Sequence, residues 1–307
     1  MDEKFLKKSI IQTLIFYDIF EKPLKLKDLY FQLEKTDGKK PSFFSFCNVL
    51  ESLVNEGLVK KKDDYYFLKN KEDYLKFQKE RNEISKKNWR KLAFVSKIIN
   101  IVPFICMVGV LGSLSIDNCS KRSDIDLIII TKKNRIFLVR FFLTILLDLF
   151  FVRRTKTKIA RRVCLNNFIA EDNLTFPFPS LYNAHSFSNL IPIIDRDSFY
   201  FKFKEKNNWV LNYLYFWKDK TPPFFIKKQS KIALILEEIL KGNFGDFLEK
   251  KVKNIQIKRK NKNYPFGVKN GRVILNDTLI ELHPNSKEKR IEEEYKLRLK
   301  NYLRPNQ

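Results

Sequence analysis

Two carboxylates stand two residues apart at the start of an apolar run and could act on the same ligand. Asp124 and Asp126 precede the β-branched segment 128–131, which has the pattern of a buried strand. Residues i and i+2 of a strand point to the same face, with Cα atoms about 6.5 Å apart. We therefore expect both side chains to bind metal together. Two Mg²⁺ ions held about 3.5–4 Å apart can stabilise the attacking and leaving oxygens of a phosphoryl or nucleotidyl displacement.

A Gly-Ser turn upstream could supply the phosphate-binding part of such a site. An apolar run ends at Gly112 and Ser113, and ten residues later the chain reaches Asp124. Glycine lets the backbone approach a ligand closely, and the N–H groups of the turn and the Ser113 hydroxyl can bind phosphate oxygens. Ser123, directly before Asp124, is a further candidate for contact with a nucleotide.

Together, Leu111-Gly112-Ser113 and Asp124-Ile125-Asp126 resemble the signature of the polymerase-β-like nucleotidyltransferase superfamily. The resemblance implies a mixed sheet with flanking helices. It also implies transfer of a nucleoside monophosphate from an NTP, with ATP as the expected donor, to an acceptor that the sequence does not identify. Two Mg²⁺ ions would be the cofactors, Asp124 and Asp126 the catalytic residues and metal ligands, and Gly112, Ser113 and Ser123 the nucleotide-binding residues. The alternative interpretation is a plain turn and a strand-edge aspartate, because Asp-x-Asp is frequent by chance.

Active members of this superfamily usually carry a third carboxylate on the next strand, where this chain has none. Strand alternation predicts that Cys164, Asn166 and Phe168 point toward the site, while Glu171 and Asp172 lie just past the strand. The chain also resembles a group of bacterial nucleotidyltransferase-domain proteins with an N-terminal winged helix and a Cys-x-Asn strand. Two hypotheses follow: an active transferase, or a catalytically weakened nucleotide-binding regulator that binds DNA through its winged helix.

The composition is that of a folded, strongly basic protein. The 307 residues are 44% hydrophobic, and 60 Lys and Arg face 35 Asp and Glu, for a net charge of +25. Such a field attracts nucleotides, nucleic acid or anionic lipid, so nucleic acid is an expected partner of the basic surface. The four cysteines form no Cys-x-x-Cys pair, which favours a reducing cytoplasm over a disulfide framework or zinc site.

The segment 137–152 is the most apolar of the chain. It has about 16 residues against the roughly 20 that a membrane span needs, and it contains Arg140 and Asp148. We expect a buried helix and no stable membrane insertion, and contact of this helix with a bilayer is the alternative. The first residues are polar and amphipathic, without the pattern of a signal peptide.

The N-terminal 70 residues have the pattern of a winged helix-turn-helix. Helices are expected over 5–20, over 25–33 and after Ser42, and Gly57 follows the third helix. The segment 59–68 is predicted to form a β-hairpin. The third helix carries no Lys or Arg on its expected outer face, although phosphate neutralisation drives DNA binding. A contact with protein and a purely architectural role therefore stay open beside DNA binding.

The rest of the chain predicts an α+β fold. A connecting helix is expected over 71–102, before a nucleotidyltransferase domain that extends to residue 220 with aromatic-rich helices over 181–192 and 200–216. A mainly helical region, 221–307, has Pro222-Pro223 at its start, with helices over 230–240 and 287–303 and a hairpin between them.

Six basic residues fall in the ten-residue segment 153–162. This segment is either a solvated loop or an electropositive lip for a triphosphate or a nucleic-acid acceptor.

Overall fold

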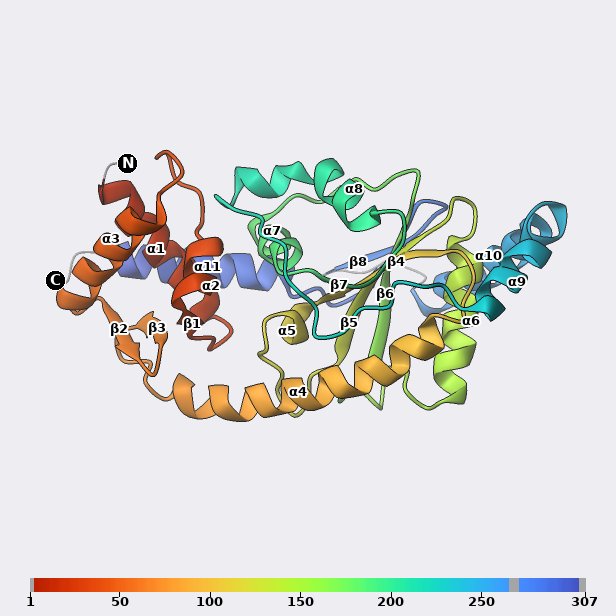
Figure 1. Ribbon diagram of the computed structural model, residues 1–307, viewed down its shortest axis with the longest axis horizontal. Coiled ribbons are helices and arrows are strands. Elements are labelled where there is room, and N and C mark those ends of the chain that lie inside the picture. The colour runs from red at the N-terminus through yellow and green to blue at the C-terminus, as the bar shows by residue number, and fades with distance from the viewer. Residues whose placement is uncertain (1–2, 265–270, 304–307) are drawn as a thin grey trace.

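The computed structural model describes residues 3–264 and 271–303 and has an α+β architecture. The chain forms an elongated body with an N-terminal helical module at one end, a central sheet, and a pair of helices at the other end (Figure 1). The N-terminal module and the helix that leads out of it contain α1 (Glu3–Asp18), β1 (Leu24–Lys25), α2 (Leu26–Phe31), α3 (Phe43–Asn55), β2 (Val59–Lys62), β3 (Tyr65–Leu68) and α4 (Tyr74–Ile99).

The N-terminal module has the helices and the hairpin that the sequence predicts. The Ser42 hydroxyl caps α3 by accepting a hydrogen bond from the backbone N–H of Ser45 at 3.1 Å. Gly57 follows α3 with φ +73°. Asp63 and Asp64 both have positive φ in the turn between β2 and β3, as a tight hairpin turn requires. The three strands pair antiparallel in the order β1-β3-β2.

The helix α4 connects the module to the central sheet, as expected for 71–102. It runs along one edge of the molecule beneath the sheet (Figure 1). Leu92, Val95 and Ile99 of α4 are buried in the main core beside the sheet.

The central sheet has six strands in the order β7-β4-β5-β6-β9-β8. Only the β5–β6 pair is parallel among these neighbours, so the sheet is mixed. α6 and α4 cover one face, while α7 and α8 cover the other. The elements of this region are β4 (Ile105–Leu111), α5 (Gly112–Ser115), β5 (Ile125–Thr131), α6 (Ile136–Leu149), β6 (Val163–Ala170), α7 (Leu181–Ser188), β7 (Ile191–Asp195), α8 (Phe199–Lys206) and the 3₁₀ helix η1 (Asn208–Asn212).

The expected helix over 181–192 is wrong in its second half. α7 ends at Ser188, and the apolar run that follows forms β7, which pairs antiparallel with β4. Pro192 cannot donate a ladder hydrogen bond, but β7 is the edge strand of the sheet, where proline is tolerated. The helix expected over 200–216 is also shorter, because α8 ends at Lys206 and only η1 follows it.

The stretch 221–307 contributes to both ends of the molecule. It contains α9 (Lys231–Leu240), α10 (Asn243–Asn263), β8 (Arg272–Leu275), β9 (Leu279–His283) and α11 (Glu288–Leu303). The hairpin β8–β9 completes the central sheet, because β9 pairs antiparallel with β6. The residues directly before β8, 265–270, lie outside the described part of the chain. α11 then runs back to pack against α1 (Figure 1). Among the helices described, none combines the length and apolar character needed to cross a bilayer.

Candidate active site

The antiparallel pairing of β4 and β5 brings the Gly-Ser turn against the carboxylates. Leu111, the last residue of β4, pairs with Asp126, so the turn at Gly112 passes directly over that side chain. Gly112 has φ +66°, and a Cβ atom there would lie 2.6 Å from Asp126 Oδ2. Both the backbone conformation and the close approach therefore require glycine at this position.

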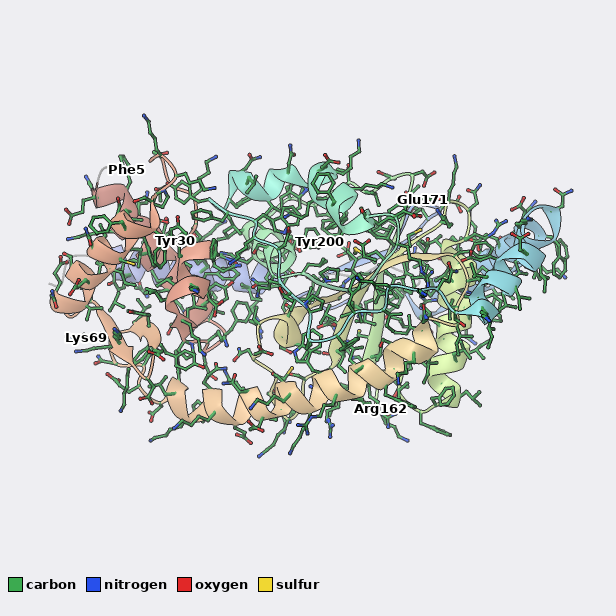
Figure 2. All side chains as sticks on the ribbon, in the orientation of Figure 1. Phe5, Tyr30, Lys69, Arg162, Glu171 and Tyr200 are labelled. Carbon is green, nitrogen blue, oxygen red and sulfur yellow. The ribbon has the colours of Figure 1, made fainter. Side chains whose placement is uncertain are left out.

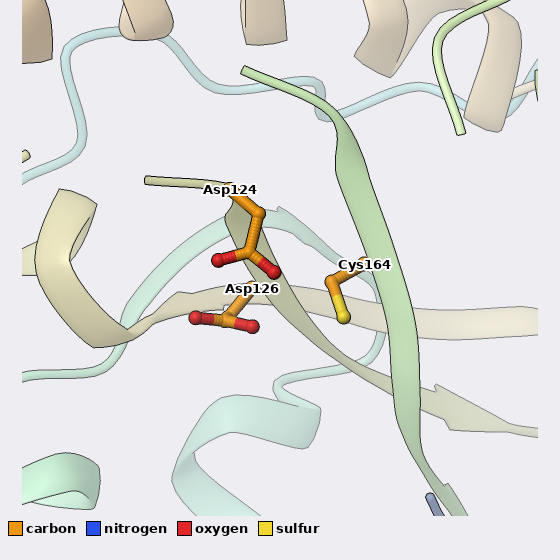
Figure 3. A group of neighbouring side chains, drawn as sticks. All are labelled: Asp124, Asp126 and Cys164. Carbon is orange, nitrogen blue, oxygen red and sulfur yellow. The ribbon is translucent and has the colours of Figure 1, made fainter. Parts of the chain in front are cut away.

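Asp124, Asp126 and Cys164 point toward one another at the start of two neighbouring strands (Figure 3). Their potential ligand atoms all lie within 4.8 Å of one another. The parallel register of β5 and β6 sets Cys164 opposite Asp126. The thiol thus occupies the place beside the carboxylates at which the resemblance leads one to expect a third carboxylate.

The predicted alternation along β6 is wrong beyond Cys164. Asp126 pairs with Cys164 but Ile128 pairs with Asn167, so β6 holds one extra residue at this point. The bulge sets Asn167, in place of Asn166, beside the site cavities, and Phe168 packs into the opposite core with the α6 face. A bulge of this kind has no signal in the alternation of the sequence.

The two carboxylates just past β6 do not reach the site. β6 runs parallel to β5, so Glu171 lies at the far end of the sheet from Asp124. Figure 2 shows Glu171 on the side of the sheet away from α5. Its carboxylate accepts hydrogen bonds from Lys132 Nζ and from the backbone N–H of Lys133, and Asp172 pairs with Lys133 at 3.6 Å.

One arginine of the basic segment 153–162 reaches into the site. Arg154 Nη1 lies 3.0 Å from Asp124 Oδ2 and donates to Cys164 Sγ at 3.2 Å. The other side chains between residues 155 and 161 are exposed. Most of the segment is thus a solvated loop, as the first interpretation predicts, while Arg154 supplies a positive charge at the carboxylates.

Burial and repulsion hold the pKa of Asp126 well above its usual value. Burial and then the neighbouring Asp124 raise the pKa of Asp126, Arg154 and Lys287 act in the opposite direction, and the net result is a pKa of about 7. Burial likewise raises the pKa of the Cys164 thiol, which keeps the sulfur protonated at neutral pH. The donors that are ready to bind a cation are therefore the two carboxylates.

We expect Mg²⁺ binding to strengthen as pH rises to about 7. Asp126 must lose its proton to bind metal, so the Mg²⁺ affinity should increase about tenfold per pH unit below its pKa. Without metal, the raised pKa of Asp126 should lower stability as pH rises from about 4 to about 7. The gap between thermal midpoints with and without Mg²⁺ should consequently widen over this range. A difference between the two thermal midpoints that stays constant between pH 5.5 and 8.5 would contradict the role of Asp126 as a metal ligand.

The serines expected to bind nucleotide line the cavity above the carboxylates. Ser113 Oγ lies 3.5 Å from Cys119 Sγ, and Ser123 Oγ accepts a hydrogen bond from the backbone N–H of Ser120 at 2.9 Å. Both residues are half-buried and border the same cavity of about 440 Å³ as Gly112, Asp124 and Asp126. The structure therefore brings all the predicted site residues to one place.

Other residues that line this cavity come from segments in which no sequence motif indicates a binding site. Phe16 and Tyr17 of α1 belong to the N-terminal module, and Tyr182 and His185 belong to α7. Lys287, just before α11, brings a second positive charge toward Asp126. No spacing rule relates these residues to the Gly-Ser and Asp-x-Asp motifs, so only the fold could identify them.

A larger basic cavity adjoins the site. It has a volume of about 1050 Å³ and shares Tyr17, Ser115, Ile116 and Asn189 with the cavity over the carboxylates. Lysines outnumber acidic residues in its lining: Lys22, Lys25, Lys27, Lys79, Lys86, Lys218 and Lys220 against Asp28, Glu83, Asp117 and Asp219. Tyr65, Trp89 and Phe31 add aromatic surface.

The cations of this cavity are only partly neutralised within the protein. Lys220 Nζ donates to the carbonyl oxygen of Ser115 at 3.1 Å and to Asn189 Oδ1 at 2.6 Å, which ties it to the end of α5. Burial lowers the pKa of Lys22 to about 8 despite the nearby Asp117 and Asp28. An anionic ligand would relieve the cost of holding these charges away from water.

No protein-family model, curated protein or solved structure matches the chain. The site itself combines paired carboxylates at the mouth of a mixed sheet, a glycine turn against them, and two nearby cations, Arg154 and Lys287.

Proposed function

We propose that this chain is a Mg²⁺-dependent nucleotidyltransferase of the polymerase-β-like kind, with a winged helix-turn-helix at its N-terminus. The observation that carries the proposal is the convergence of Asp124 and Asp126 with the Gly112 turn across the β4–β5 register. Paired carboxylates offer the hard oxygen ligands that Mg²⁺ prefers, whereas a protonated thiol does not, so Asp124 and Asp126 are the residues that would hold the metal.

The residues of the site have separate tasks in this proposal. The Gly112 turn and the hydroxyls of Ser113 and Ser123 bind the phosphates of the NTP, with ATP as the expected donor. Arg154 and Lys287 neutralise negative charge on the phosphates. The metal, when bound, polarises the α-phosphate and the entering and leaving oxygens. In the transfer, an acceptor oxygen forms a bond to the α-phosphorus as the bond to pyrophosphate breaks, and the acceptor proton passes to solvent or a base.

The adjoining basic cavity supports an anionic acceptor. Its lysines and aromatic side chains suit a phosphate backbone with stacked bases, and four of its lining residues also border the site cavity. Nucleic acid therefore remains the expected partner, and its end would enter the site past Ser115 and Asn189.

The direct test is an incubation with each α-labelled NTP and Mg²⁺ in the presence of cell extract. Label should move to RNA, protein or a small molecule, with pyrophosphate released. Absence of transfer with all four nucleotides, together with absent nucleotide binding, would overturn the proposal.

A second candidate function is a regulator that binds nucleotide without turning it over and binds DNA through the N-terminal module. The observation that favours it is Cys164 in the third ligand position with Arg154 bound to Asp124. The exposed face of α3 argues against DNA binding by that helix, because Phe44, Asn48, Glu51 and Asn55 provide no cation there. Saturable nucleotide binding without label transfer would favour this candidate over the transferase.

We expect Cys164→Asp to bind Mg²⁺ about tenfold more tightly than the parent protein, because it adds a carboxylate beside two others. The same repulsion should lower the thermal midpoint without metal. Cys164→Ser is the matched control, since it keeps the size of the side chain without adding charge. Equal Mg²⁺ affinity of the Asp and Ser variants in a calorimetric titration would show that this position does not face the metal.

A further inference from the structure

The helices at the end of the molecule opposite the N-terminal module expose an unusual amount of apolar surface. More than half of the large apolar side chains exposed in the described residues lie on α6 and its C-terminal end, on α9, or on α10. They are Phe141, Ile145, Leu149, Phe150, Phe151, Ile232, Leu234, Ile235, Ile239, Phe244, Phe247 and Ile255. We refer to these twelve side chains as the apolar end surface.

Helical spacing organises this surface into stripes. Ile232, Ile235 and Ile239 share one face of α9, and Phe141, Ile145 and Leu149 share one face of α6. α10 packs against both of these helices. The stripes therefore belong to neighbouring helices at one end of the molecule (Figure 1).

On α10 the apolar stripe continues as a basic one. Phe244, Phe247 and Ile255 lie on the same helical face as Lys251, Lys258 and Lys262. The Lys251 ammonium lies 4.6 Å from the centroid of the Phe247 ring. Further exposed cations on this helix are Lys250 and Arg259.

The four carboxylates of α9 and α10 all have partners within the protein: two accept from backbone N–H groups, and two that stay exposed form ion pairs. Glu249 accepts hydrogen bonds from the backbone N–H groups of Phe137 and Leu138, and Glu237 accepts one from the N–H of Phe104. Asp246 pairs with Arg135, and Glu238 with Lys241. The outer surface is left with apolar side chains and an excess of cations.

We propose that the apolar end surface and the cations of α10 bind the surface of a bilayer that contains anionic lipid. Apolar side chains enter the boundary between headgroups and acyl chains, while lysines and arginines contact the anionic headgroups. A second copy of the chain is a poorer fit, because a symmetric contact would bring the lysines of α10 against those of its partner. The helices lie on the bilayer and do not cross it, in keeping with their length and composition.

The test is co-sedimentation of the full chain with vesicles of phosphatidylcholine alone or with about one third phosphatidylglycerol. We expect at least tenfold tighter binding to the anionic vesicles, and loss of most binding at 0.5 M salt because exposed charges are screened. Ile235→Asp with Phe247→Asp should weaken binding about tenfold or more. Lys251→Glu with Lys258→Glu should do the same.

Control variants carry changes of the same kind elsewhere on the molecule: one apolar-to-acidic substitution and one double charge reversal. Phe44→Asp replaces an exposed aromatic residue on α3, and Lys8→Glu with Lys39→Glu reverses two exposed charges of the N-terminal module. Both controls should sediment like the parent protein. Circular dichroism should show that all the variants are folded, since every changed side chain is exposed.

Three results would overturn the proposal. One is equal sedimentation with neutral and anionic vesicles. Another is equal binding by the parent protein and the two α9–α10 variants. The third is a dimer in light scattering that Ile235→Asp with Phe247→Asp converts to a monomer while no vesicle binding is seen, which would assign the surface to a second copy. The surface lies far from α5 (Figure 1), so a failure here leaves the proposed transferase untouched.

Discussion

Replacement of Asp124 or Asp126 by Asn should abolish Mg²⁺-dependent nucleotide transfer while the protein stays folded. Each change removes one of the two hard, charged ligands at the mouth of β5. The loss should be about a thousandfold or more, because metal stabilisation of the transition state contributes several kcal/mol and each 1.36 kcal/mol is tenfold in rate. Label transfer from an α-labelled NTP measures the loss, and calorimetric titration with Mg²⁺ shows whether metal binding fails with it.

Asp126→Asn should be no less stable than the parent protein without metal, because burial and Asp124 crowd this carboxylate and an amide there relieves the repulsion above pH 7. Asp124→Asn gives the same relief but loses the ion pair with Arg154, so its thermal midpoint should change less. A relief of about 1 kcal/mol would raise the thermal midpoint by about 2–4 °C. Asp172→Asn is the control, because that carboxylate pairs with Lys133 at the far end of the sheet and should leave transfer unchanged. Retained activity in both site variants would show that the carboxylates do not carry the chemistry.

Gly112→Ala should damage the site more than its small size suggests. The residue has φ +66°, where a side chain costs about 1–2 kcal/mol, and its new Cβ would lie 2.6 Å from Asp126 Oδ2. The carboxylate or the turn must move by several tenths of an ångström. Because misplacement of about 1 Å can cost about a hundredfold in rate, we expect transfer to fall by that order, with weaker Mg²⁺ binding.

Gly57→Ala separates the effect of backbone strain from the effect of the clash. Gly57 has φ +73° but an added Cβ there would meet nothing within 4 Å. Its alanine variant should lose stability of the same order as the strain at Gly112 and keep full Mg²⁺ and nucleotide binding. If the two variants lose stability equally and both keep transfer, Gly112 serves only the turn.

The sequence was sufficient where structure depends on neighbours along the chain. Ser42 and Gly57 mark the two ends of α3 because capping and positive φ are local requirements. The Asp63-Asp64 turn and the β-branched run of β5 are local signals of the same kind. The motif spacing predicted that Gly112 and Asp126 lie close together, because a short connection between adjacent strands leaves few other arrangements.

The sequence failed where the outcome depended on pairing across the sheet. The run after Leu190 became strand β7 because the edge of β4 was available to it, which no local pattern expresses. Because of the bulge in β6, Asn167 lies beside the site where Asn166 was predicted, since one extra residue exchanges the two faces of a strand.

The sequence by itself indicated two carboxylates at the start of one strand and a glycine turn before them, and it left Cys164, Asn166 and Phe168 as candidates for the position beside the carboxylates. Only the tertiary structure decided what surrounds them. Arg154 was one of six basic residues in its segment, and nothing but the path of the loop between α6 and β6 selected it as the partner of Asp124. Phe16 and Lys287 come from opposite ends of the chain and reach the cavity because α11 packs against α1. Contacts between distant segments depend on which surfaces pack together in the folded protein, so a motif within one segment does not predict them.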